Sequence, residues 1–225
     1  MQQGGQRYRK RRPLPAVLLI VVLGIAATIV WFRVMNQDSE VTGAAHCEAP
    51  TSTPPPVEGQ PAPTLGKALE HDALNGTEPS PPATALVRVV NASGQRGAAR
   101  LVTENLRALG FTQIGDPGND TLYGESMACR AQIRFGAQGE AAARTVSLVE
   151  PCAELIRDER QDATVDIAIG EKFDDLHPNR AARTLMEQLN DFAKQNPPAQ
   201  GGLQADVPQP NLDTGLLAAA RNVQC

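Results

Sequence analysis

An uninterrupted uncharged run near the N-terminus constrains this chain more than any other feature. Residues 13–32 carry no charge and consist mostly of Leu, Val, Ile and Ala. Twenty helical residues rise about 30 Å, which matches the hydrocarbon thickness of a bilayer. Trp31 and Phe32 stand at the far end, where aromatic rings favour the membrane interface, and Arg33 ends the run. We therefore expect residues 13–33 to form one transmembrane helix, with the lipid bilayer as its partner.

The charges that precede this run indicate its orientation. Five basic side chains lie just before it, at Arg7, Arg9, Lys10, Arg11 and Arg12. Basic residues beside a membrane span remain on the cytoplasmic side. Residues 1–12 are therefore predicted to be a cytoplasmic basic tip, and everything after the span is predicted to be extracytoplasmic.

Three other interpretations of the apolar run fit the sequence less well. A cleaved signal peptide has a shorter apolar run with a small-residue site directly behind it, whereas the Gly-Ala-Ala at residues 43–45 lies well beyond Arg33. A lipoprotein needs small residues before its cysteine, but His46 precedes Cys47. A buried core helix seldom lacks a polar face for so long. The sequence favours an uncleaved single-pass anchor in the cell membrane.

The exported part is acidic, which limits its partners. From residue 34 onward the chain holds 15 basic and 25 acidic side chains, a formal charge of −10. Such a charge repels phosphate backbones, so nucleic-acid binding is not expected. Electrostatic adhesion to acidic wall polymers would require bridging cations. Only 4% of the residues are aromatic, which leaves core material for one domain of about 100 to 130 residues.

All four cysteines lie on the predicted exported side. An even number in an oxidising compartment indicates two disulfides, for which three connectivities exist. We favour Cys129–Cys152 within the domain and Cys47–Cys225 between the ends of the exported part. No CxxC or HxxxH spacing occurs and the three histidines are scattered, so neither a metal site nor a cofactor is predicted.

Composition divides the exported part into a linker, a domain and an extension. Nine of the 18 prolines fall between Pro50 and Pro82, so residues 34–84 are predicted to be a semi-rigid extracytoplasmic linker. Apolar residues at near-helical spacing over 65–74 indicate one brief helix within it. Residues 85–172 are expected to form the folded domain. Residues 173–225 are expected to be a partly disordered extension with helices over 178–195 and 212–223.

Hydrophobic periodicity within the domain predicts strands and helices in the order β-α-β-β-α-β. In the third strand Ala131, Ile133 and Phe135 alternate inward, while Gln132 and Arg134 point outward as on a half-buried strand. Such an order most often packs as an α/β (α+β) ferredoxin-like sandwich, with two helices on one face of a four-stranded sheet. The predicted strands are 85–90, 111–114, 131–135 and 163–169, and the predicted helices are 98–109 and 141–148.

Two separated motifs in this domain resemble the LytR C-terminal domain family. The first is Val-Arg-Val-Val-Asn-Ala-Ser-Gly at residues 87–94, followed by Gly-Ala-Ala at 97–99 and Leu-Gly-Phe at 109–111. The second is Ile-Arg-Phe-Gly at residues 133–136, followed by Gln-Gly-Glu-Ala-Ala-Ala at 138–143. The resemblance spans about residues 85–170. The complete layout of anchor, proline-rich linker and lone domain is similar to that of an actinobacterial envelope protein.

This resemblance implies a binding or scaffolding role in cell-envelope integrity or wall assembly, without a defined catalytic activity. The implied partners are a cell-wall polymer, a lipid-linked precursor or envelope-assembly proteins. In LytR-CpsA-Psr proteins the module accompanies a phosphotransferase domain. Only a linker precedes the domain here, so the ligase chemistry of those proteins is not expected.

The distribution of reactive residues also argues against catalysis. No histidine lies between residues 85 and 170, which disfavours a Ser-His-Asp or Cys-His arrangement. Carboxylate pairs occur at 158–159 and 174–175, but they lie in charged runs, which are usually solvated faces. We expect no catalytic residues.

The segment at residues 91–97 is the sharpest local motif. It follows a strand and opens a helix, so free N–H groups could receive an anion beside Arg96. Asn91, Ser93, Gly94, Arg96 and Gly97 are therefore the candidate ligand-binding residues. The alternative function is a sensor or hydrolase-like domain that binds a phosphorylated lipid or wall precursor here. The structural alternative is that Asn91 and Ser93 cap the helix while Gly94 relieves a tight turn.

Overall fold

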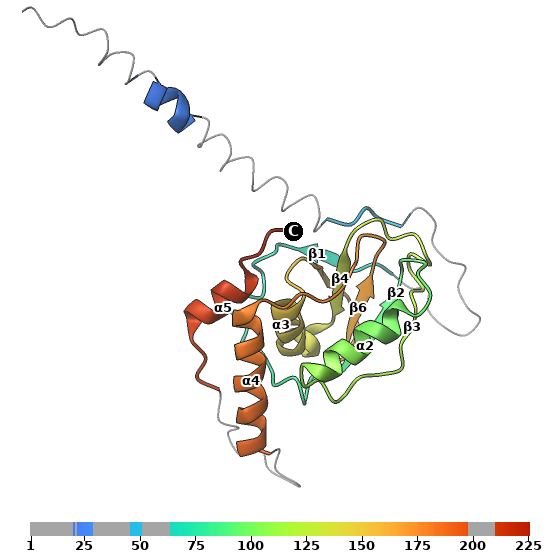
Figure 1. Ribbon diagram of the computed structural model, residues 1–225. Coiled ribbons are helices and arrows are strands. Elements are labelled where there is room, and N and C mark those ends of the chain that lie inside the picture. The colour runs from blue at the N-terminus through green and yellow to red at the C-terminus, as the bar shows by residue number, and fades with distance from the viewer. Residues whose placement is uncertain (1–19, 21, 29–45, 51–63, 198–209) are drawn as a thin grey trace, which may run out of the picture. The chain divides into compact units, whose positions relative to one another are not determined.

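The computed structural model describes residues 20, 22–28, 46–50, 64–197 and 210–225 (Figure 1). The chain divides into two compact units, Met1–Glu40 and Val41–Cys225. In the first unit residues 22–28 are helical, and Ile20 and Leu23 are more than half exposed. Within the described ranges, no helix has the length and apolar character needed to cross a membrane. The basic tip and most of the predicted span lie outside these ranges, so the anchor stays a prediction.

The second unit is built on one mixed β-sheet with helices packed against it (Figure 1). Its sheet has six described strands in the order β1-β5-β4-β6-β2-β3. The strands are β1 (Lys67–Leu69), β2 (Val87–Asn91), β3 (Gly118–Asn119), β4 (Ala131–Phe135), β5 (Glu154–Arg157) and β6 (Val165–Ile169). The helices are α2 (Ala98–Ala108), α3 (Glu140–Val149), α4 (Arg180–Gln195) and α5 (Thr214–Arg221), with a short 3₁₀ turn at Ala137–Gly139.

The α+β class is confirmed, but the ferredoxin-like order is not. A ferredoxin-like sheet is antiparallel throughout, whereas here β2 pairs with β6 and β4 pairs with β5 in parallel. The predicted strand at 111–114 makes only one isolated bridge, between Ile114 and Val87. The sequence prediction also missed β5, which follows α3 directly and lies beside β4. The right-handed twist of strands favours such a β4-α3-β5 crossover.

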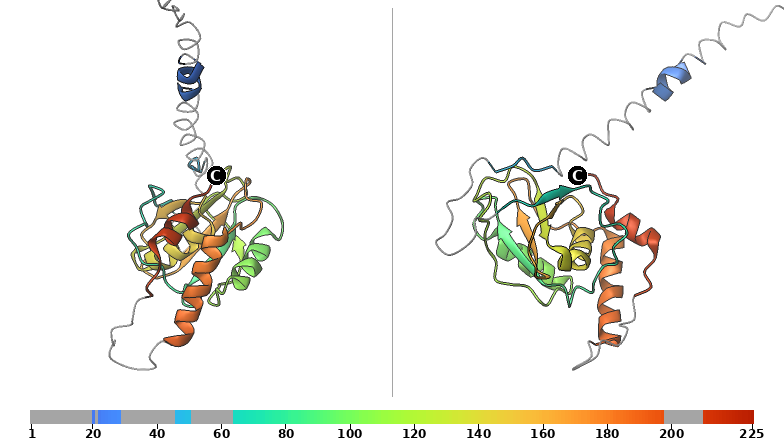
Figure 2. Two further views of the ribbon diagram at one scale, coloured as in Figure 1. Left: turned by 60° about the vertical axis from the view of Figure 1, so that its left-hand side comes forward. Right: turned by 180° about the vertical axis from the view of Figure 1, so that it is seen from behind.

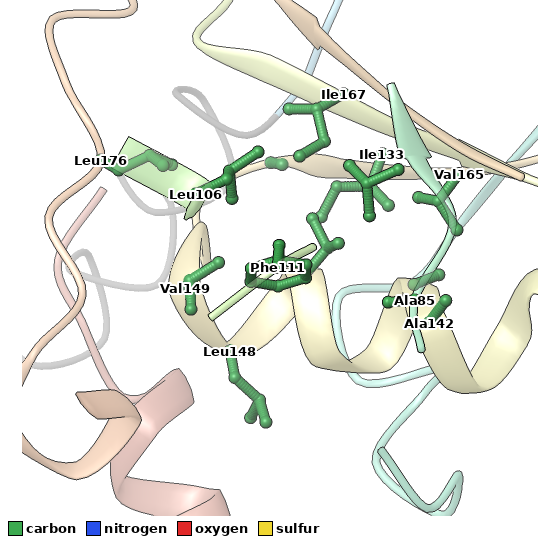
Figure 3. Packing of buried hydrophobic residues seen from close by; sticks show 14 of the residues in the cluster. Ala85, Leu106, Phe111, Ile133, Ala142, Leu148, Val149, Val165, Ile167 and Leu176 are labelled. Atoms are coloured by element: carbon green, nitrogen blue, oxygen red, sulfur yellow. The ribbon is translucent and has the colours of Figure 1, made fainter. Parts of the chain in front are cut away.

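One face of the sheet is apolar and carries the main core. Val89, Ile133 and Ile167 come from three neighbouring strands and are fully buried. Figure 3 shows Phe111 lying between the strands that carry Ile133 and Ile167 and the helix that carries Val149. The alternation predicted for the strands therefore holds on this face. Helices α2, α3 and α4 contribute further buried residues of the same cluster.

The predicted linker is partly folded. Residues 67–69 form β1, which pairs antiparallel with β5, and Leu74 is buried in the core. The brief helix expected at 65–74 is therefore wrong, because its residues add an edge strand and a series of turns to the sheet instead. Residues 34–45 and 51–63 lie outside the described ranges.

The C-terminal extension packs on the domain. Leu185, Met186 and Leu189 of α4 are buried in the main core, as the predicted amphipathic helix requires. Helix α5 lies beside α4 in both views of Figure 2 and also contacts α3. Residues 198–209, between these helices, are not described.

The disulfide connectivity differs from the prediction. All four cysteines are paired, but Cys47 is bonded to Cys129 and Cys152 is bonded to Cys225. Cys129 and Cys47 belong to a second buried cluster, on the face of the sheet away from the main core. Cys152 lies just after the end of α3, beside the tail that follows α5 and contains Cys225. Cys129 lies on the second face of the sheet, whereas Cys152 follows a helix on the face of the main core. Each therefore bonds the cysteine on its own side, which is Cys47 for Cys129 and Cys225 for Cys152.

Candidate functional site: a charged hollow on the sheet

The face of the sheet opposite the main core carries charged side chains. Strand register places Arg88 of β2 opposite Asp166 of β6, and Asp166 opposite Arg134 of β4. Residues at paired positions point to the same side of a sheet. An Arg-Asp-Arg row therefore runs across three strands on the face opposite Val89 and Ile133.

Asp166 is the centre of this row. Arg88 donates from Nε and Nη2 to its two carboxylate oxygens, each at 2.8 Å, and Arg160 donates from Nη2 at 3.0 Å. The Asp166 side chain is only 8% exposed. Burial acts to raise the pKa of Asp166, but the hydrogen bonds from Arg88 and the nearby charge of Arg160 outweigh it and hold the pKa below its usual value. Asp166 is thus an anion at neutral pH.

Arg160 joins Asp166 to a second carboxylate, Asp158. Its Nη2 lies 2.6 Å from Asp158 Oδ2, and its Nη1 donates to the Thr164 carbonyl at 3.2 Å. The Asp158 side chain is 15% exposed. The prediction that residues 158–159 form a solvated charged run is therefore wrong for Asp158, because the Arg160 guanidinium covers its carboxylate. Asp174 of the other predicted pair is exposed and bonded to Arg130.

Arg134 lies deeper in the same face. It forms an ion pair with Asp120, donates to Gln132 Oε1 at 2.9 Å and stacks over the Tyr123 ring at 5.5 Å. Asp120 also accepts the backbone N–H groups of Leu122 and Tyr123. Gln132 and Arg134 lie on the face away from Ile133, as predicted, but the half-buried exposure predicted for this strand is wrong. Both are buried, because the segment that contains Asp120 and Tyr123 covers this face.

Between these groups the surface is hollowed by about 430 Å³. We call this region the charged hollow. Its charged lining comprises three arginines and four aspartates: Arg88, Arg134, Arg160, Asp116, Asp120, Asp158 and Asp166. Exposed Asn119 and Thr121 add neutral polar groups at its rim. The charged hollow thus offers fixed donors and fixed acceptors side by side, with its buried charges already compensated.

The predicted loop at residues 91–97 is held together by its own hydrogen bonds. Asn91 Oδ1 accepts from the N–H and hydroxyl of Ser93, and Asn91 Nδ2 donates to the Gln95 carbonyl. Gly94 adopts a φ of 71°, so the tight turn predicted there is confirmed. The caps predicted for Asn91 and Ser93 are wrong, because Gly97 occupies the N-cap of α2 with no side-chain hydrogen bond. Arg96 is exposed, and ligand binding by this loop stays a prediction.

The charged hollow presents hydrogen-bond donors and acceptors that ion pairs hold in place. Its lining contains no histidine, cysteine or lysine, and the described part of the chain holds no free cysteine. The same described residues include no group of three metal-ligating side chains. Each guanidinium group of the charged hollow is bound to a carboxylate and therefore serves as a fixed hydrogen-bond donor.

Sequence analysis missed these residues as a group. Arg88, Arg134 and Asp166 each occupy a polar position of a predicted strand, and opposite charges across neighbouring strands are a recognised stabilising pattern. However, the pattern becomes a site only when the strand order brings β2, β6 and β4 together. Arg160 and Asp158 lie between strands, where no periodicity marked them.

The fold and the charged hollow together define the class of protein: a mixed α+β domain with its core on one face of the sheet and a charged hollow on the other. A family model described as LytR cell envelope-related transcriptional attenuator matches residues 84–173. The chain belongs to this LytR C-terminal domain family.

Two relatives extend the comparison beyond the domain. The chain is 34% identical over 187 residues to the cell envelope integrity protein Cei of Mycobacterium tuberculosis, covering 82% of this chain and 84% of that protein. A crystal structure of the soluble domain of a conserved hypothetical secreted protein from Mycobacterium marinum superimposes with a TM-score of 0.59 at 33% identity. The match covers 72% of this chain and 99% of that one.

Proposed function

We propose that this chain is a membrane-anchored extracytoplasmic binding protein that supports cell-envelope integrity by holding a wall glycan in the charged hollow. The observation that carries the proposal is the lining of the hollow, where fixed guanidinium donors alternate with fixed carboxylate acceptors. Sugar hydroxyls both donate and accept, so they complement a surface of this kind. The likeness to a protein named for envelope integrity supports the cellular role.

Charge favours a neutral glycan over an acidic polymer. The charged side chains of the hollow number three basic and four acidic, and the part of the chain beyond residue 33 is acidic as a whole. A polyanion would meet repulsion from this surface. A neutral hydroxyl-rich chain meets none, and its hydroxyl groups can form hydrogen bonds with the exposed Asn119 and Thr121 at the rim.

Deletion of the gene tests the cellular role. Cells that lack the protein are expected to become permeable to detergents and large antibiotics, and the full-length chain should restore resistance. A rescue by the full chain that fails with the Asn119→Ala/Thr121→Ala variant at equal protein levels would assign the role to the charged hollow. The proposal falls if the deleted cells keep normal resistance.

A further inference from the structure

Two buried arginines lie on the other side of the domain without a counter-ion. Arg144 of α3 is 2% exposed and Arg221 at the end of α5 is 7% exposed. Neither forms a salt bridge with any carboxylate of the described ranges, although every guanidinium in the charged hollow has one. Buried cations are normally paired, because desolvation of an unpaired charge is costly.

The hydrogen bonds of these two side chains satisfy only part of their donors. Arg221 donates from Nη1 to the Ser147 carbonyl at 3.0 Å and from Nη2 to the His71 carbonyl. Arg144 donates from Nη1 to Asn75 Oδ1 at 3.0 Å. The Nε–H of both arginines is buried and has no partner among the described atoms. Neutral acceptors hold the side chains in place, and the Asp72 carboxylate, which acts on Arg221 through its charge, lies too far away to form an ion pair with it.

The electrostatic cost of this arrangement is visible in both groups. Burial lowers the pKa of Arg144, and burial together with the charge of Arg144 lowers the pKa of Arg221 to about 10. The two guanidinium groups therefore repel one another in a poorly solvated environment. An anion placed between them would remove both the repulsion and the desolvation cost.

The space for such an anion is present. Arg144 and Arg221 line a cavity of about 370 Å³ together with Asn75, Leu217 and Ala218. Its walls come from α3, from α5 and from the turn that contains Asn75. Two arginines facing one cavity are the usual means by which proteins hold an oxyanion, through paired charge-assisted hydrogen bonds.

We propose that this cavity is a binding site for a phosphate group, either free or on a phosphate ester, with Arg144 and Arg221 as its cationic ligands. The site is independent of the charged hollow, which lies on the opposite face of the sheet. Leu217 and Ala218 form an apolar wall that suits an ester carrying a hydrocarbon chain.

Calorimetric titration of the full-length chain in detergent micelles tests the proposal, with inorganic phosphate and dodecyl phosphate as probes at constant ionic strength. Both probes are expected to bind. Arg144→Gln should weaken binding by about tenfold or more, as expected for a lost charge-assisted hydrogen bond, and Arg144→Lys should retain part of it. Tighter binding of dodecyl phosphate would indicate a lipid-borne ester, and equal binding would indicate a soluble phosphate.

Two further variants separate binding from folding. Ala218→Trp adds an indole at an exposed position of α5 and fills the cavity while both arginines are retained, so it should abolish binding in a folded protein. Arg100→Gln removes an exposed charge on α2 and should leave binding unchanged. Absence of binding to the wild type, or equal binding by wild type, Arg144→Gln and Ala218→Trp, would overturn the proposal.

Discussion

Asp166 shows how one buried carboxylate can fix the geometry of an ion-pair network. Its carboxylate receives three hydrogen bonds from two guanidinium groups at the centre of the sheet. Loss of this one anion would leave Arg88 without its ion pair and Arg160 with Asp158 alone. The site therefore depends on Asp166 for its geometry, although Asp166 is the least accessible of its carboxylates except Asp120.

We predict that Asp166→Asn lowers the free energy of unfolding by about 2 to 4 kcal/mol at pH 7. A buried pair that loses one partner typically costs 3 to 5 kcal/mol, and the half-exposed Arg88 reduces that value here. Asp191→Asn is the matched control, because Asp191 pairs with Lys194 on an exposed helix face. It should cost about 0.5 kcal/mol or less. Urea unfolding of both variants measures the difference.

The pH dependence of the same variant provides its internal check. The folded protein lowers the pKa of Asp166, so its stabilising effect is complete above the unfolded pKa of about 4 and is lost as the pH falls toward the folded value. The difference in stability between wild type and Asp166→Asn should therefore shrink below about pH 4. A difference that stays constant from pH 7 into the acid range would contradict this account.

At the scale of elements, the two disulfides attach the two ends of the folded unit, at Cys47 and Cys225, to opposite sides of the sheet. Cys152–Cys225 attaches the tail after α5 to the end of α3, and these two helices also line the arginine cavity. Arg221, the last residue of α5, donates to the Ser147 carbonyl of α3. The disulfide and the buried arginine thus hold α5 at the same place.

We predict that Cys152→Ala/Cys225→Ala lowers the free energy of unfolding by about 4 kcal/mol. The disulfide closes a separation of 73 residues, and the chain-entropy model gives a loss of this size. Denaturation of the full chain in urea measures it. Peptide mapping of the unreduced wild type should recover Cys47–Cys129 and Cys152–Cys225, and recovery of a Cys129–Cys152 peptide would contradict the fold.

The sequence predicted elements well where one periodicity dominated. Strands β2, β4 and β6 and helices α2, α3 and α4 were all expected within a few residues of their bounds, because apolar residues recur along each at a single period. Strand β5 was missed because it is short, with a glutamate and an arginine at its ends. The pairing of β1 with β5 depends on contacts between distant segments, which local patterns do not encode.

The candidate site was less predictable than the fold. The 91–97 loop attracted attention because its motif is local, and its glycine turn is indeed present. The charged hollow and the arginine cavity each combine residues from three or more separate segments. The charged side chains at their centres are polar in sequence but buried in the fold, and burial is set by strand order and by covering segments.

At the scale of the whole molecule, the architecture fits a tethered receptor. The folded unit Val41–Cys225 begins soon after the predicted anchor at residues 13–33. Two disulfides suit an oxidising compartment outside the membrane. A charged hollow and an arginine cavity on separate faces would let one domain contact a glycan and a phosphate-bearing molecule together. Such a protein could support an envelope by binding alone.

Co-sedimentation of the purified full-length chain with insoluble, neutral wall glycan tests the central claim most directly. The wild type should pellet with the glycan, and Arg100→Gln, an exposed change on α2, should pellet equally. Asn119→Ala/Thr121→Ala keeps every ion pair of the charged hollow and should remain largely in the supernatant. A wild type that stays in solution, or a double variant that pellets as fully as the wild type, would contradict the account.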